Sequence, residues 1–408
     1  MIARRARAAF RPETELLLCC ARPRADNAHG DRSRALLQSP LDWEVVIREA
    51  RRHGVDPLLY RHLEALDEPR IPASALDRLQ RHFETNAVRN RLLMAELGKV
   101  LSRLGDASVA AIPYKGPVLA RMVYGGLALR RFADLDVLVR RADVSRAIVA
   151  LRELGYEPRL RLTRSQERAF LASQCEWALD RDHGRLTVEI HWDIVPREFA
   201  LRLDLERLWR TARPQSVDGL TVLVPSPEGL LLILAVHGAK HFWARLAWLA
   251  DVAGLIEAHP EMDWSQLLAR AHQCGGTRLL GVALILVADL LGAPVPSDVA
   301  HRLASDNSTT ALAEQVAQWL AGAPIPAERS LGALRAAMAL RERRRDRVTQ
   351  LWRTALTPTI EDWASVPLPA ALSPVHYLVR PFRLAAKRTA ALLGSVAPSR
   401  RRGDQPSS

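Results

Sequence analysis

The stretch from Ile112 to Val139 constrains the fold more than any other part of this chain. Its pattern predicts a strand, a glycine turn, a short helix, a second turn and a second strand. In the second strand Asp134 and Asp136 are two residues apart, so their side chains share one face while the apolar residues take the other. Two neighbouring carboxylates repel each other unless a cation lies between them. Hard oxygen ligands suit magnesium or manganese better than zinc, and the pair therefore predicts a metal platform for phosphoryl transfer.

The turn before the short helix predicts an anion site. Gly116 lets a phosphate approach the backbone closely, and Pro117 is favoured at the first position of a helix. A helix over residues 117–123 would aim free backbone N–H groups at the turn. Lys115 lies beside it and is one of only four lysines among 58 basic residues, which favours a specific role for its compact ammonium group. Arg130, just before the aspartate pair, could contact a phosphate or brace the carboxylates.

A third carboxylate is expected from a strand near residues 185–194, where polar and apolar residues alternate. We predict Glu189 as this third metal ligand, and it could also accept the proton of an acceptor hydroxyl. Asp193 on the same face is the first alternative, and Asp180 and Asp182 are further ones. A solvated charge on an edge strand is the simpler interpretation of Glu189.

Three basic side chains, His237, Lys240 and His241, fall within one turn of a predicted helix. Histidines four residues apart also occur in zinc sites, but neither the expected Glu nor a third ligand accompanies them here. We predict that Lys240 reaches the β- and γ-phosphates of a nucleotide, with His237 or His241 near the ribose or base. Helix-capping or core-rim histidines are the structural alternative. Asp251 could hold one of these basic groups or pair with Arg245.

These motifs resemble the polymerase-beta-type nucleotidyltransferases, and more closely the branch of uncharacterised bacterial nucleotidyltransferases. The resemblance is strong from about Asn86 to Ile256 and extends thinly to about Arg383. The superfamily usually has Gly-Gly or Gly-Ser in the turn, where this chain has Lys-Gly. The matching residues are Lys115-Gly116, Arg130, Asp134-Leu135-Asp136, Val188-Glu189-Ile190-His191-Trp192, His237-Gly238-Ala239-Lys240-His241 and Trp248-Leu249-Ala250-Asp251.

The resemblance implies an α+β fold, with a short mixed sheet and helices like those of polymerase beta, flanked by helices on both sides. It implies transfer of a nucleoside monophosphate group from a nucleoside triphosphate (NTP) to a hydroxyl or phosphate, with release of pyrophosphate. Asp134, Asp136 and Glu189 would hold two Mg²⁺ ions, or Mn²⁺. The nucleotide-binding residues would be Lys115, Gly116, Arg130, His237, Lys240 and His241.

The acceptor is left open: a small molecule, a peptide, a saccharide or tRNA would each fit. One alternative is a catalytically degenerate protein that binds nucleotides or serves as a scaffold. Another is a transferase linked to tRNA or to a toxin–antitoxin pair.

Hydrophobic periodicity divides the chain of 408 residues into five predicted segments. These are a poorly ordered N-terminus (1–40), a helical lead-in (41–105), the catalytic core (106–225), a helical C-terminal domain (226–393) and a basic disordered tail (394–408). Strands are predicted at 109–112, 134–139, 157–162, 174–181, 185–194 and 220–224. Lead-in helices are predicted at 41–53, 56–65 and 73–104, and single long helices near the C-terminus at 329–356 and 374–393.

The formal net charge of +13 suggests an anionic partner. A nucleotide, a phosphorylated acceptor, nucleic acid and a membrane surface all qualify. Arginines crowd residues 341–353 and 380–402, where a solvated face is the default and a nucleic-acid or lipid contact is the functional alternative. Only Trp352 and Phe382 interleave with them in the sequence, too few aromatic residues for a base-stacking platform, which disfavours nucleic acid. Four cysteines without a paired motif, and no apolar run long enough to span a bilayer, predict a cytoplasmic location.

Overall fold

A five-stranded mixed sheet forms the centre of the predicted catalytic core, in a computed structural model that describes residues 10–24, 27–327, 330–358 and 375–383. The strand order is β1-β2-β5-β4-β3, in which β2 and β5 are parallel and all other neighbours antiparallel. The fold is α+β, as predicted. The strands are β1 (Ala111–Pro113), β2 (Leu135–Val139), β3 (Glu157–Pro158), β4 (Glu176–Arg181) and β5 (Leu186–His191).

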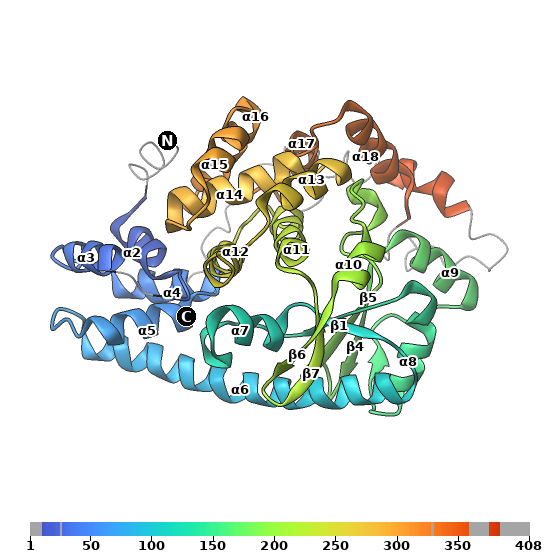
Figure 1. The fold of residues 1–408 in the computed structure, drawn as a ribbon, viewed down its shortest axis with the longest axis horizontal. Coiled ribbons are helices and arrows are strands. Elements are labelled where there is room, and N and C mark those ends of the chain that lie inside the picture. Colours follow the sequence, from blue (N-terminus) through green and yellow to red (C-terminus); the bar gives the residue numbers. More distant parts are fainter. Residues whose placement is uncertain (1–9, 25–26, 328–329, 359–374, 384–408) are drawn as a thin grey trace, which may run out of the picture.

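The apolar face of β2 forms as its alternation predicts. Leu135, Val137 and Val139 are buried in one hydrophobic cluster with residues of α6 (Ala73–Asp106) and α8 (Val144–Arg152). Figure 1 shows α6 along the lower edge of the molecule and the helices from α11 onward above the sheet. Because α6 and α8 cover the apolar face of β2, the polar side chains of this strand take the opposite face of the sheet.

Helices precede the sheet where the sequence predicts them. They are α4 (Trp43–His53), α5 (Asp56–Leu66) and α6. Asp42 begins α4 by accepting the backbone N–H groups of Glu44 and Val45, and Gly54 ends it with a φ of 71°.

The N-terminal segment is a correction. Residues 1–40 were expected to be poorly ordered, but the described part contains α2 (Pro12–Cys20) and α3 (Asn27–Leu36). Leu16 and Leu17 are completely buried and belong to the main hydrophobic core. α2 packs against α4 and α14, so a short apolar run without its own periodicity gains its partners from distant helices.

Between β3 and β4 the structure also differs from the prediction. The strand expected at 157–162 is only two residues long, and α9 (Arg164–Ser173) follows it. Thr163 and Gln166 form a capping box at the start of α9. This pair was a helix-start signal that the strand prediction overlooked.

A two-stranded hairpin closes this part of the chain. After α10 (Leu205–Thr211), β6 (Arg213–Val217) pairs antiparallel with β7 (Leu220–Val224). Asp218 and Gly219 form the turn with φ of 50° and 81°. β7 was predicted, whereas β6 was not, because its first four residues are exposed and give no apolar alternation.

The rest of the described chain is mainly helical, and residues of α11 to α17 share one core with α2, α4 and α5. The helix predicted over residues 329–356 is in fact two, α17 and α18, because Arg341 turns inward between them and is only 1% exposed. Residues 375–383 are helical, whereas the rest of the predicted 374–393 helix and the tail over 394–408 lie outside the described residues. The helices are α11 (Pro227–Lys240), α12 (Leu246–Ala258), α13 (Trp264–Cys274), α14 (Thr277–Leu291), α15 (Ser297–Ala304), α16 (Asn307–Leu320), α17 (Leu331–Ala339) and α18 (Arg344–Leu356).

Membrane-spanning segments were searched for over these described residues, and none of their helices has the length and apolar character to cross a bilayer.

Candidate functional site

The Lys-Gly turn lies against the start of β2. Gly116 begins α7 (Gly116–Tyr124) with a φ of 55°, a conformation that favours glycine. A Cβ atom at this position would lie 3.5 Å from the carbonyl oxygen of Asp134. The buried Nζ of Lys115 donates to Oδ1 of Asp136 at 3.0 Å. The Lys115-Gly116 turn and the aspartate pair, which are separate in the sequence, are therefore in direct contact.

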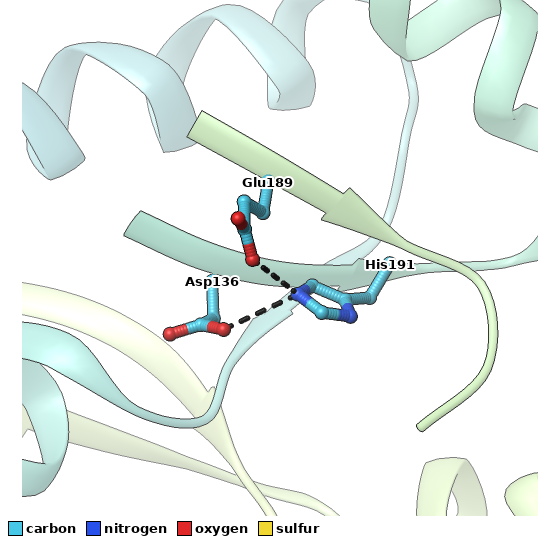
Figure 2. A group of neighbouring side chains, drawn as sticks. All are labelled: Asp136, Glu189 and His191. Atoms are coloured by element: carbon cyan, nitrogen blue, oxygen red, sulfur yellow. Dashed lines mark ion pairs between the residues drawn. The ribbon is translucent and has the colours of Figure 1, made fainter. Parts of the chain in front are cut away.

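The parallel pairing of β2 and β5 brings Asp136 opposite Glu189, with Leu138 opposite His191. Registered partners point to the same side of a sheet, and Figure 2 shows Asp136, Glu189 and His191 converging from the two strands. Nε2 of His191 lies 3.2 Å from Oδ1 of Asp136 and 3.4 Å from Oε2 of Glu189. The structure thus brings together two of the predicted carboxylates and adds a histidine between them.

Asp134 lies just before β2 and is half-buried. Burial raises the pKa of its carboxyl to about 6, and the negative charges of Asp136 and Glu189 act in the same direction. Asp134, the remaining predicted carboxylate, is therefore near enough to Asp136 and Glu189 to be affected by their negative charge. Its oxygen atoms do not belong to the tight group that Asp136, Glu189 and His191 form.

Two cations balance this negative charge. Burial opposes protonation of His191, but the carboxylates of Asp136, Glu189 and Glu176 outweigh it and raise the pKa of the imidazole to about 9. Burial also favours the neutral form of Asp136, yet Lys115 and His191 hold the pKa of its carboxyl well below the usual range. At neutral pH the site thus contains ionised carboxylates together with a protonated histidine and a lysine.

Glu176, at the start of β4, belongs to the site and was missed from the sequence. It is the registered partner of His191 across the β4–β5 pair, and its Oε2 lies 3.5 Å from Nδ1 of that histidine. The same oxygen lies 3.4 Å from Nζ of Lys240. The predicted strands at 174–181 and 185–194 contained the signal, because counting back across the short turn between them places Glu176 opposite His191.

Lys240 is the last residue of α11, and its contact with the site is the hydrogen bond that its Nζ donates to Glu176. His237 and His241 both pack against Trp248, with ring centroids 5.5 and 5.1 Å from the centroid of its ring; His237 meets this ring edge-on and His241 is tilted by 31° to it. Burial lowers the pKa of His241 to about 4, with help from Lys240, and also holds the pKa of His237 well below its usual value. Both imidazoles are thus neutral, and Lys240, the residue predicted to reach the β- and γ-phosphates, is a cation beside them.

Arg130 lies next to the carboxylates but points its guanidinium elsewhere. Its Nε and Nη2 donate to the carboxylate of Asp251 at 2.8 and 2.9 Å. The hydroxyl of Tyr124 donates to the same carboxylate at 2.6 Å. Asp251 therefore pairs with Arg130 and not with Arg245, the partner suggested by the sequence.

The alternative carboxylates lie outside the cluster. Asp180 forms a bidentate pair with Arg159 at the sheet edge, with both distances 2.8 Å. Asp193 accepts the backbone N–H of Ile194 at 2.8 Å. Asp182 is in the exposed β4–β5 turn with a φ of 53°.

The donor set fits a divalent metal ion. Asp136, Glu189 and His191 each offer a ligand atom, all within 4.8 Å of one another, and no other such trio occurs among the residues the structure describes. His237 and His241 thus have no third partner for a zinc site there. Both ring nitrogens of His191 are buried, yet neither makes a hydrogen bond of good geometry. Two carboxylates and an imidazole suit manganese or zinc as well as magnesium.

Comparison with known proteins agrees with this geometry. A family model described as "Uncharacterised nucleotidyltransferase" matches residues 39–292, a span that contains the turn, both aspartates, Glu189 and the α11 basic residues. No curated protein and no solved structure matches the chain significantly. Because the matched span covers more than half of the sequence, the chain belongs to this family of uncharacterised nucleotidyltransferases.

Proposed function

We propose that the protein is a metal-dependent nucleotidyltransferase that moves a nucleoside monophosphate group from an NTP to a hydroxyl or phosphate acceptor. The observation that carries the proposal is the β2–β5 register, which places Asp136 beside Glu189 next to the Lys115-Gly116 turn. Membership of a nucleotidyltransferase family supports the reaction class.

In this proposal Asp134, Asp136 and Glu189 are the metal ligands, and His191 could become a further one on losing its proton. When bound, two magnesium or manganese ions would neutralise the triphosphate and lower the pKa of the acceptor hydroxyl. The acceptor oxygen forms a bond to the α-phosphorus while the bond from that phosphorus to the pyrophosphate oxygen breaks. Glu189 takes the acceptor proton, and pyrophosphate leaves.

The remaining predicted residues position the nucleotide. The backbone N–H groups at the start of α7 and the ammonium of Lys115 are directed to the phosphates. Lys240 extends this positive edge, and the neutral His237 and His241 offer ring faces to the ribose or base. Arg130 is proposed to support the nucleotide site indirectly, since Nε and Nη2 of its guanidinium already bind the carboxylate of Asp251.

Thermal unfolding with each of the four NTPs, with and without Mg²⁺ or Mn²⁺, tests the proposal. A nucleotide at about 100 times its dissociation constant should stabilise the wild type by ~2.7 kcal/mol in a metal-dependent manner. The double variant Asp134→Asn/Asp136→Asn should lose this shift relative to its own ligand-free state. The matched control Asp180→Asn, on the same sheet but outside the cluster, should keep it.

No shift with any nucleotide, or an equal shift in the double variant, would contradict the proposed site. A degenerate binding protein is the second candidate, favoured by one observation: Lys115 and His191 both pair with Asp136 and balance its charge. Such a protein would bind an NTP but release no pyrophosphate with any hydroxyl or phosphate acceptor. A pyrophosphate-release assay across an acceptor panel separates the two.

A further inference from the structure

α18 has an apolar stripe on its outer side. Its large apolar residues recur at helical spacings of three and four, so they share one face. All are exposed, and Trp352 is 64% exposed. They are Val348, Leu351, Trp352 and Leu356.

The polar side of α18 faces the protein instead. Gln350 is buried, and its Oε1 accepts from Nε of Arg341 at 2.8 Å. Nη1 of Arg353 donates to the carbonyl of Arg197 at 3.0 Å, and Nε of Arg347 donates to the carbonyl of Arg341 at 2.9 Å. A surface helix normally buries its apolar face, so this helix is held in the opposite orientation. Polar contacts anchor it, and its apolar stripe is left for a partner.

The helix over residues 375–383 repeats this arrangement. His376 and Arg380 are buried, and Nε of Arg380 donates to the carbonyl of Thr354 in α18 at 3.2 Å. Leu378 and Phe382, one turn apart on the opposite side, are 70% and 77% exposed. Figure 1 shows these two helices together at the outer edge of the molecule. We call the exposed set the C-terminal apolar residues: Val348, Leu351, Trp352, Leu356, Tyr377, Leu378 and Phe382.

The described residues around this set are strongly basic. Residues 341–358 and 375–383 contain 8 basic residues and only 2 acidic ones. Arg344 and Arg345 are exposed and precede Val348 by four and three residues, so they lie on the same face as the stripe. A second copy of the chain docked on this face would bring arginines against arginines. The charge instead matches an anionic partner that also offers an apolar phase.

We propose that α18 and the helix over residues 375–383 dock on the surface of an anionic phospholipid membrane. The C-terminal apolar residues would enter the boundary between head groups and acyl chains, while Arg344 and Arg345 would pair with lipid phosphates. Nucleic acid fits less well: Trp352, Tyr377 and Phe382 offer ring faces, but the other four exposed apolar residues have none on which a base could stack. Surface docking requires no spanning helix, and it is independent of the proposed catalytic function.

Vesicle co-sedimentation of the full chain tests the inference. We expect binding to vesicles of equal parts phosphatidylglycerol and phosphatidylcholine, and none to phosphatidylcholine alone. Trp352→Ser/Phe382→Ser keeps every charge and should weaken binding at least ~tenfold, because both apolar side chains leave the interface. The matched control Val88→Ser/Leu92→Ser alters an exposed apolar pair one turn apart on α6 and should bind like the wild type.

A second variant tests the charges separately. Arg344→Gln/Arg345→Gln should weaken binding about fivefold per arginine, and the loss should be larger at low salt. Binding that survives the Trp352→Ser/Phe382→Ser change would overturn the role of the apolar face. No vesicle binding, with retention of single-stranded RNA, would overturn the proposal in favour of nucleic acid. If the protein does not bind vesicles but self-associates, and Trp352→Ser/Phe382→Ser abolishes the self-association, the face would be assigned to a second copy of the chain.

Discussion

His191 is the side chain on which the charge balance of the candidate site depends. It is buried between strands, and ion-pair distances of 3.2 to 3.5 Å separate its ring nitrogens from three carboxylates. Buried carboxylates that lack a cation tend to take up protons, as the raised pKa of Asp134 illustrates. Lys115 and the protonated His191 supply the positive charge that keeps Asp136 ionised. In the proposed function, the carboxylates and His191 would bind the metal, and Lys115 would bind the triphosphate.

Replacing Glu189 should distinguish the predicted third ligand from its first alternative. Glu189→Gln should lower the affinity for Mn²⁺ more than about tenfold, because it removes one anionic donor of a three-residue set. Asp193→Asn should have little effect, since the Asp193 carboxylate accepts the N–H of Ile194 and lies outside that set. Electron paramagnetic resonance of free Mn²⁺ at a fixed pH measures both. Equal losses, or a loss for Asp193→Asn alone, would assign the ligand to Asp193.

The sequence predicts some of these side chains better than others. Asp136 and Glu189 could be predicted because a period of two fixes the face of each, and their strands pair in register. Glu176 could not be chosen by this rule, since its role depends on which residue it opposes across the β4–β5 turn. His191 was on the predicted face, yet its position between carboxylates is set by packing.

At the level of elements, Arg130 joins three helices just before β2 begins. Its guanidinium binds Asp251 of α12, the carboxylate that Tyr124 of α7 also contacts. Its carbonyl oxygen accepts from Asn86 and Asn90 of α6 at 3.2 and 2.8 Å. The start of β2, and with it Asp134, is therefore held by the helices around it.

Breaking this junction should destabilise the fold. Arg130→Met should lower the free energy of unfolding by about 3–5 kcal/mol, because it leaves the carboxylate of Asp251 buried without its partner. Arg130→Met/Asp251→Leu should recover part of the loss. Urea unfolding measures both, and Arg140→Met, which breaks the exposed pair with Glu206, should cost no more than about 1 kcal/mol. Normal stability of Arg130→Met with lost nucleotide binding would instead favour a direct phosphate contact.

Element boundaries were predicted best where local signals agree. α4 has a cap, an apolar face and a terminal glycine, and it begins and ends close to its predicted limits. α9 was missed although Thr163 caps it, because alternating Leu160 and Leu162 just before it favoured a strand. The break between α17 and α18 depends on the burial of Arg341 over the ring of Phe199, 4.0 Å from its centroid, which no local pattern predicts.

Across the whole molecule, the core extends beyond the segment that the family model matches. α2 lies before residue 39 and α15 to α18 lie after residue 292. Even so, residues of α2, α12, α14 and α16 share one hydrophobic cluster. Arg22, just after α2, pairs with Glu257 of α12 at 2.5 Å, and both side chains are nearly buried. The N-terminal helix is thus part of the same packed unit as the helices above the candidate site.

Leu17→Ala tests this integration directly. Leu17 is completely buried in α2, so the cavity left by the change should lower the free energy of unfolding by about 2–5 kcal/mol. Leu92→Ala on α6 removes the same atoms from an exposed position and should change stability by no more than about 0.5 kcal/mol. Urea unfolding followed by tryptophan fluorescence measures both. If the two variants unfolded alike, the N-terminal segment would not be packed into the core, and the prediction of poor order over residues 1–40 would stand.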